Sequence, residues 1–271
     1  MRQIERSDLR NGFTLIELSI VLVIIGLIVG GVLVGQDLIR AAEVRSQIAQ
    51  VEKLNTTVNT FRGKFNAIPG DMAAATASQF GFANSSCAGT AGLRDGNGVL
   101  EGNTGSASLL QGGGETGLFW NDISSSVAGN LIDGSFSTAT CTSTPTVTSG
   151  GNFSAYILPS KLGRGTYINV YSVNGANYYG LSVAIEIELG YLSTFQGLSV
   201  MQAYNIDTKM DDGIPMQGNV ITNYSSNGSI NESSYSATSD STSCYETTTN
   251  KYSISVNNGA GGNCALSFKF Q

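Results

Sequence analysis

The sequence predicts an α+β fold in which one long N-terminal helix packs on a mainly antiparallel β-sheet domain. Two patterns predict the helix. An apolar run of 23 residues extends from Phe13 to Gly35, and an amphipathic segment with apolar residues at every third or fourth position follows it as far as Phe65. The sheet is predicted by later runs that are rich in β-branched and aromatic residues. A helix followed by antiparallel strands is typical of the α+β class.

The apolar run is long enough to cross a membrane. As a helix, 23 residues span about 34 Å, and Glu17 is the one charge among them. Three arginines precede the run, which predicts that residues 1–12 stay in the cytoplasm and the rest crosses the membrane. A secretory signal would have small residues at a cleavage site after the run, whereas here the small residue, Gly12, precedes it.

The order Gly12, Phe13, Thr14, Leu15, Ile16, Glu17 ahead of an apolar helix resembles the prepilin signature of the type IV pilin superfamily. That superfamily includes type IV pilins, type II secretion pseudopilins and competence pilins. The resemblance covers about residues 10–40 and implies a pilin-like fold. It also implies cleavage between Gly12 and Phe13 by a prepilin peptidase, and N-methylation of Phe13. Further implied partners are other pilin or pseudopilin subunits and an inner-membrane assembly platform.

Glu17 needs a partner if it lies inside a membrane, because a buried carboxylate there costs several kcal/mol. After cleavage, the ammonium of Phe13 lies within one helical turn of Glu17, in the same subunit or in a neighbouring one. The family resemblance implies that the pairing of Glu17 with a neighbour's Phe13 sets the axial stagger of assembly. The alternative is an interfacial charge at the end of a simple anchor.

Four glycines in the apolar run have the spacing of close helix packing. Gly26 and Gly30 form one GxxxG pair, and Gly31 and Gly35 form another. The family resemblance implies that they serve helix packing in a filament core, while the alternative is the ordinary frequency of glycine in membrane helices. The proline that many type IV pilins carry in this half of the helix is missing, which weakly favours a pseudopilin over a major pilin.

The predicted organisation has four parts: a leader (1–12), a membrane or filament-core helix (13–35), the amphipathic half of that helix (36–66) and a globular domain (67–271). In the amphipathic half, the apolar stripe is expected to pack on its own domain, and a coiled coil with a partner is the alternative. The stripe consists of Val44, Ile48, Val51, Leu54, Val58, Phe61 and Phe65.

Within the globular domain, a helix is predicted at 116–128 with Trp120 in the core, and a second at 193–210. A hairpin is predicted from 166 to 188 around the turn sequence NGAN. Further strands are predicted at 219–224, 251–256 and 265–270, and the polar segment 223–243 is predicted to be an exposed loop.

Composition narrows the function classes. The chain has no histidine, which removes the commonest general base and metal ligand. Its net charge is −6 with no basic patch, so no nucleic-acid partner is expected. A structural role is therefore favoured over an enzyme, with no required cofactor.

Two acidic groups are candidates for calcium. In RDGNGVLEG, Asp95, Asn97 and Glu101 offer oxygen ligands on a tight turn, and a plain glycine-rich turn is the alternative. The second group, Asp207, Asp211 and Asp212, follows a predicted helix, where three acids need a cation or Lys209 for compensation.

Four cysteines lie far apart, and an even number in an exported chain favours two disulfides. The resemblance to type IV pilins implies that Cys244 pairs with Cys264, which leaves Cys87 for Cys141. Crossed pairings stay open on the sequence alone.

The sequence therefore predicts a processed, non-enzymatic subunit of a type II secretion pseudopilus or a type IV pilus. Its predicted location is the bacterial inner membrane, with a periplasmic globular domain, and then the filament or cell surface. The alternatives are a major type IV pilin, a membrane-anchored binding or adhesion module that does not polymerise, and an enzyme tethered by its helix.

Overall fold

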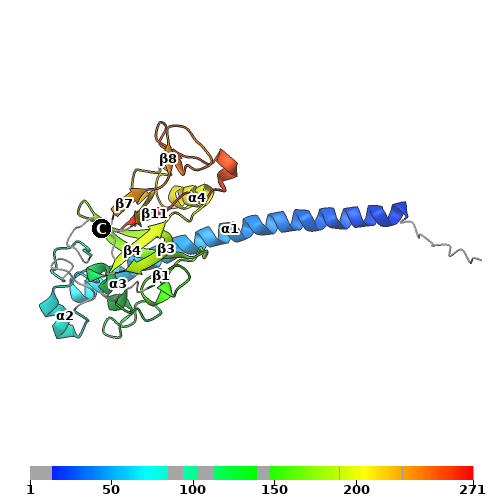
Figure 1. Cartoon of the computed structure of the whole chain (residues 1–271). Helices are drawn as coiled ribbons and strands as arrows, with labels where there is room; N and C mark the ends of the chain where they lie inside the picture. The colour runs from blue at the N-terminus through cyan, green and yellow to red at the C-terminus, as the bar shows by residue number, and fades with distance from the viewer. Residues whose placement is uncertain are drawn as a thin grey trace, which may run out of the picture. The chain divides into compact units, whose positions relative to one another are not determined.

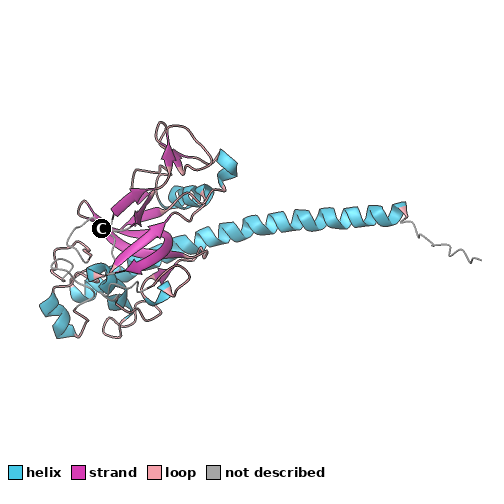
Figure 2. Ribbon diagram, in the orientation of Figure 1, coloured by secondary structure: helices cyan, strands magenta, loops and turns pink. Residues whose placement is uncertain are grey.

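The structure is a computed structural model that describes residues 14–84, 94–102, 113–138, 147–188, 190–226 and 229–270. The chain divides into two compact units, residues 1–42 and 43–271. Figure 1 shows the elements in chain order and Figure 2 their secondary structure. The prediction of an α+β fold with a long N-terminal helix is confirmed, and the arrangement is consistent with a pilin-like fold.

Helix α1 (Leu15–Phe65) is continuous and contributes residues to both units. It ends where Asn66 adopts a left-handed conformation (φ 51°) and its amide donates to the carbonyl of Arg62. A residue in this conformation commonly ends a helix. Pro69 lies three residues further on, and proline is common at such positions because it cannot continue a helix. The amphipathic segment that the sequence predicts as far as Phe65 therefore ends where expected.

The second half of α1 packs on one face of the central sheet, which lies in front of it in Figure 1. The predicted stripe supplies the contact: Val51, Leu54 and Phe61 are at most 2 % exposed. Across the sheet, three facing residues of neighbouring strands form a fully buried row, which consists of Ile168, Leu181 and Leu266. Packing on its own domain is thus the observed role of the stripe.

The central sheet has six strands, and all its pairings are antiparallel. Strand β3 is the longest: it pairs with β2 along one edge and with β11 and then β4 along the other. The strands are β1 (Leu158–Pro159), β2 (Thr166–Val173), β3 (Ala176–Glu188), β4 (Tyr191–Phe195), β5 (Val220–Ile221) and β11 (Leu266–Lys269). The predicted hairpin turn within NGAN is a two-residue turn between β2 and β3, in which Asn174 and Gly175 both have the positive φ that such a turn requires.

Smaller elements surround this sheet. Strands β6 and β7 form an antiparallel hairpin, and β8, β9 and β10 form a three-stranded sheet in which β8 and β9 run parallel. Their bounds are β6 (Asn223–Ser226), β7 (Ser229–Glu232), β8 (Tyr235–Ser236), β9 (Tyr245–Glu246) and β10 (Lys251–Tyr252). The helices are α2 (Ala74–Phe80), α3 (Gly114–Ser124), α4 (Val200–Met210), and the 3₁₀ turns Phe153–Ala155 and Val256–Gly259.

One sequence prediction in this region is right only in part, and a second is wrong. The predicted helix 193–210 begins within strand β4, and only its later part is helix α4, because Ser199 forms a capping box with Gln202 that starts the helix there. The polar segment 223–243, predicted as an exposed loop, contains the β6–β7 hairpin and β8. Ser225 in that hairpin is fully buried and its amide donates to the hydroxyl of Thr194, so hydrogen bonds replace apolar packing there.

A buried ion pair joins three segments beside the end of α1. Arg94 donates from both terminal nitrogens to the carboxylate of Asp122 in α3, at 2.9 and 2.5 Å, and both side chains are fully buried. Asp122 also accepts the amide of Gly70 at 2.8 Å, and Arg94 Nε donates to the carbonyl of Ala83 at 2.7 Å. Burial raises the pKa of Asp122, and the guanidinium of Arg94 opposes that rise.

We expect Arg94→Met to lower the melting temperature of the chain by roughly 10 °C, because an unpaired buried carboxylate costs about 3–5 kcal/mol. Thermal unfolding of the full chain in detergent measures this effect. The matched control is Lys53→Met, which breaks the exposed pair of Lys53 with Asp133 at 3.9 Å and is expected to cost about 1 kcal/mol or less. Equal effects of the two substitutions would contradict this account of the buried pair.

Candidate functional site

The first candidate site is the N-terminal part of α1. Every large apolar side chain from Leu15 to Ile39 is exposed in the isolated chain. By length and composition, α1 is a candidate membrane-spanning helix, and it lies near the start of the chain. This surface needs lipid or other protein to cover it, because exposed apolar patches of this size are rare on soluble monomers.

Glu17 lies in the first turn of this helix and forms a capping box with Thr14. Its Oε2 accepts the amide of Thr14 at 2.8 Å and the Thr14 hydroxyl at 2.7 Å, and its own amide donates to Thr14 Oγ1 at 3.3 Å. These bonds satisfy amide groups that a helix start leaves unpaired. The predicted pairing of Glu17 with Phe13 stays a prediction, because Gly12 and Phe13 lie outside the described residues.

The four glycines of the two GxxxG pairs lie on the surface of α1. At Gly26, Gly30, Gly31 and Gly35, a Cβ atom would meet no other atom within 4 Å. The helix surface is therefore open at these points, and a second helix can approach its backbone there.

The second candidate site is an acidic cluster beside the end of α1. Carboxylate oxygens of Asp71, Asp95 and Glu115 lie within 4.8 Å of one another. Asp71 belongs to the turn after α1, Asp95 to the following loop, and Glu115 to the first turn of α3. Gly70 permits this approach: it has φ 87°, and a Cβ there would lie 2.3 Å from the Glu115 carbonyl oxygen.

Backbone amides surround two of these carboxylates. Asp71 accepts the amides of Gly96, Asn97 and Gly98 at 3.0, 3.1 and 2.8 Å. Glu115 accepts the amides of Asp95 and Glu101 at 3.2 and 2.9 Å. The two acidic side chains thus shape the loop that contains the predicted calcium ligands.

Burial dominates the electrostatics of this cluster. It is the main cause that raises the pKa of Glu115 from 4.5 to about 8 and that of Asp71 from 3.8 to about 6, and neighbouring carboxylates contribute to both rises. The amide hydrogen bonds oppose these shifts but do not cancel them. Three acids held this close therefore favour either a proton or a cation among them.

Of the calcium ligands predicted in the loop RDGNGVLEG, the structure places only some in the acidic cluster. Asp95 joins the cluster, whereas the three-carboxylate group does not include Glu101. Asn97 uses its amide group locally, donating to Asp95 at 2.9 Å and accepting from Val99 at 2.7 Å. Sequence reasoning missed Asp71 and Glu115 because they lie in other segments, although Asp71 follows a Pro-Gly turn directly after the helix.

The second predicted acidic group does converge. Oxygens of Asp207, Asp211 and Asp212 lie within 4.8 Å of one another at the C-terminal end of α4. Asp207 is fully buried and accepts the Tyr252 hydroxyl at 2.8 Å, and its pKa is raised to about 6, chiefly by burial. Within the described residues, Lys209 forms no ion pair, so the compensation expected from it is not observed.

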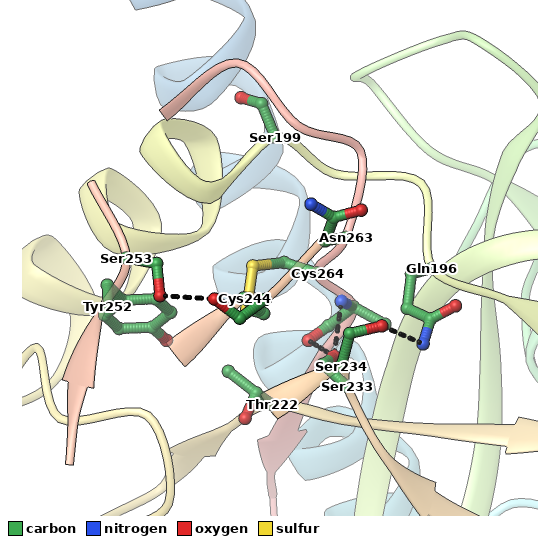
Figure 3. The surroundings of a disulfide bond; sticks show 12 residues. Gln196, Ser199, Thr222, Ser233, Ser234, Cys244, Tyr252, Ser253, Asn263 and Cys264 are labelled. Carbon is green, nitrogen blue, oxygen red and sulfur yellow. Dashed lines mark hydrogen bonds between the residues drawn. A yellow bond between two sulfur atoms is a disulfide. The ribbon is translucent and has the colours of Figure 1, made fainter. Parts of the chain in front are cut away.

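A disulfide links Cys244 and Cys264, as the resemblance implied. Figure 3 shows the bond among polar side chains of several segments, including Ser233, Ser253 and Thr222. Both cysteines are fully buried, and the backbone of Cys264 pairs with Leu198 just before α4. The predicted partners Cys87 and Cys141 lie outside the described residues.

Comparison with known proteins bears on the N-terminal site. Residues 8–33 match a family model described as the prokaryotic N-terminal methylation motif. No curated protein and no solved structure matches the chain. The matched segment contains Gly12, Phe13, Glu17, Gly26 and Gly30, so the chain carries a type IV pilin-like prepilin signal.

The acidic cluster predicts a pH dependence of stability. Between about pH 4 and pH 8 the folded chain holds protons on Asp71 and Glu115 that the unfolded chain releases. Their contribution is therefore complete below about pH 4 and is lost as the pH rises to about 8. We expect the melting temperature of Glu115→Gln, measured in EDTA, to fall less over this range than that of the unsubstituted chain. Parallel curves for the two proteins would contradict the raised pKa of Glu115.

Calcium binding stays a prediction from the sequence. At pH 7, calcium at 100 times its Kd would stabilise the chain by about 2.7 kcal/mol, which raises the melting temperature by roughly 5–10 °C. Asp71→Asn should reduce the shift if the ion binds beside α1, and Asp211→Asn if it binds beside α4. Asp133→Asn, a change in an exposed acid, is the control. No shift at millimolar calcium would show the prediction to be wrong.

Proposed function

We propose that this chain is a prepilin whose mature form is a pseudopilin-like or minor-pilin-like filament subunit. A prepilin peptidase removes residues 1–12, Phe13 is N-methylated, and the helix that follows joins the core of a type II secretion pseudopilus or a type IV pilus. The observation that carries this proposal is the methylation motif at residues 8–33, which continues directly into the exposed apolar part of α1.

The two halves of α1 support this role. Val44 to Phe61 pack on the chain's own sheet, whereas Leu15 to Ile39 have no cover within the described residues. A single helix of this kind can lie in the inner membrane before assembly, with its domain in the periplasm. It can then pack against the same helices of other subunits in a filament, with the open glycine positions at the contacts.

Glu17 is the residue that distinguishes a helix that assembles into a filament from one that only anchors the chain in a membrane. Glu17 lies in the first turn of the helix, so about 3 kcal/mol, the insertion cost of an acid at the centre of a membrane helix, is an upper value for it. Thr14 occupies one oxygen of Glu17, Oε2, and no hydrogen bond to the other involves a described residue. We assign this second oxygen to the ammonium of a neighbouring subunit's Phe13.

An enzymatic role has little support. The chain has no histidine. Of the carboxylates with raised pKa values, Asp122 is paired with Arg94, and the others belong to two clusters whose neighbours are mainly backbone amides and one tyrosine. The alternatives that keep some support are a major type IV pilin and a membrane-anchored binding module that does not polymerise. Both would have the same N-terminal helix.

We expect Glu17→Ala to reduce the amount of this protein in sheared filaments at least tenfold, because loss of one partner of a desolvated charge pair costs about 2–5 kcal/mol. Quantitative immunoblotting of filament and envelope fractions measures this. Glu52→Ala, a change in an exposed acid on the same helix, is the matched control and should assemble normally.

The globular domain of Glu17→Ala should stay folded, which formation of the Cys244–Cys264 disulfide and an unchanged melting temperature would demonstrate. If Glu17→Ala enters filaments as well as the unsubstituted protein does, the assembly proposal is wrong. A protein that is never found in filaments, but functions normally without Glu17, would favour the anchored binding module.

A further inference from the structure

A cavity of about 640 Å³ lies in the globular unit. Its walls are the second half of α4, the loop 212–217 and the β9–β10 hairpin with the residues that follow it. Cavities that bind small molecules typically measure about 300–1,000 Å³ and combine apolar surface with a few well-placed polar groups. This cavity fits that description. One of its lining residues, Asp212, also belongs to the second predicted calcium group.

Two tyrosines form one wall. The rings of Tyr204 and Tyr252 pack edge to face, with centroids 5.9 Å apart and planes at 67°. Tyr252 is buried and its hydroxyl donates to Asp207 at 2.8 Å, so the ring behind Tyr204 is held in place. Tyr204 is only half-buried, and its ring lines the cavity while packing on the ring of Tyr252. A ring held in this way loses less conformational entropy when a ligand binds.

The rim carries hydrogen-bonding groups that the described part of the protein does not use. No hydrogen bond or ion pair among the described residues involves the side chains of Gln217, Asn250 or Lys251. Asp212 accepts the amide of Ile214 with one oxygen, at 2.8 Å, which leaves its second oxygen to a ligand. Amides and a carboxylate can each bond two adjacent hydroxyl groups.

The charges of the rim favour a neutral ligand. The rim carries two acids, Asp212 and Glu246, and one lysine, Lys251, so charges of both signs are present and neither a polyanion nor a polycation is matched by the wall. Glu246 is ionised, but both of its oxygens already accept hydrogen bonds, from Ser239 and Thr249. The remaining groups suit a molecule with many hydroxyls and one apolar face.

We propose that this cavity binds a neutral saccharide. The apolar C–H face of the sugar ring lies on Tyr204, and its hydroxyls bond with Gln217, Asn250, Lys251 and the free oxygen of Asp212. This binding needs neither cleavage after Gly12 nor filament assembly, so it stands or falls separately from the proposed function.

The test uses the full chain in an amine-oxide detergent, because maltoside and glucoside detergents are themselves sugars. An array of immobilised neutral mono- to tetrasaccharides identifies the bound sugar, and saturation-transfer NMR with that sugar gives the Kd. We expect a Kd of about 1 mM, which corresponds to about 4 kcal/mol.

Three variants then locate the site. Tyr204→Ala and the double substitution of Gln217 and Lys251 by alanine should each weaken binding at least tenfold. The double variant alters exposed side chains, so it keeps the test valid if Tyr204→Ala fails to fold. Lys269→Ala, a change in an exposed lysine on β11, is the control and should bind normally.

Two results would overturn the proposal: no binding to any sugar on the array, or binding that both cavity variants retain.

Discussion

The structure depends on the continuity of helix α1. Because the helix is unbroken from Leu15 to Phe65, one element carries two apolar surfaces of different kinds. Between Val44 and Phe61 the surface is a narrow stripe, most of which is buried in the core of the domain. Between Leu15 and Ile39 it is apolar on all sides, so no single face of the chain's own domain could cover it. The first surface holds the domain together, and the second is left for lipid or for other subunits.

The end of the helix organises the chemistry of the domain. Asn66 stops α1, and the turn after it presents the Gly70 amide to Asp122 and the Asp71 carboxylate to three amides of the next loop. The Arg94–Asp122 pair neutralises one of the buried acids beside this turn, whereas Asp71 and Glu115 have no cation as partner in the described residues. The contrast explains why protons or a divalent ion can change the stability of this region.

Much of the fold was predictable because it depends on local pattern. The stripe of α1, the end before Pro69 and the Asn174–Gly175 hairpin turn each follow from residues close together in the sequence. The errors arose where distant contacts decide: Ser225 is buried in a polar segment because β4 covers it, and Glu115 reaches Asp71 only through the fold. The residue pattern around Gly12 identified the prepilin signal. The cavity proposed to bind a saccharide was not predictable, because its lining residues belong to separate segments between residues 204 and 255 that only the fold brings together.

The central claim is that the chain is processed after Gly12 and assembles through the helix that this cut exposes. The most direct measurement is mass spectrometry of the N-terminal peptide of this protein, recovered from sheared filaments and from the cell envelope. The account predicts a chain that begins at Phe13 and carries a methyl group on its amine in both fractions. A chain that keeps residues 1–12, or one that is cut after the apolar run, would contradict it.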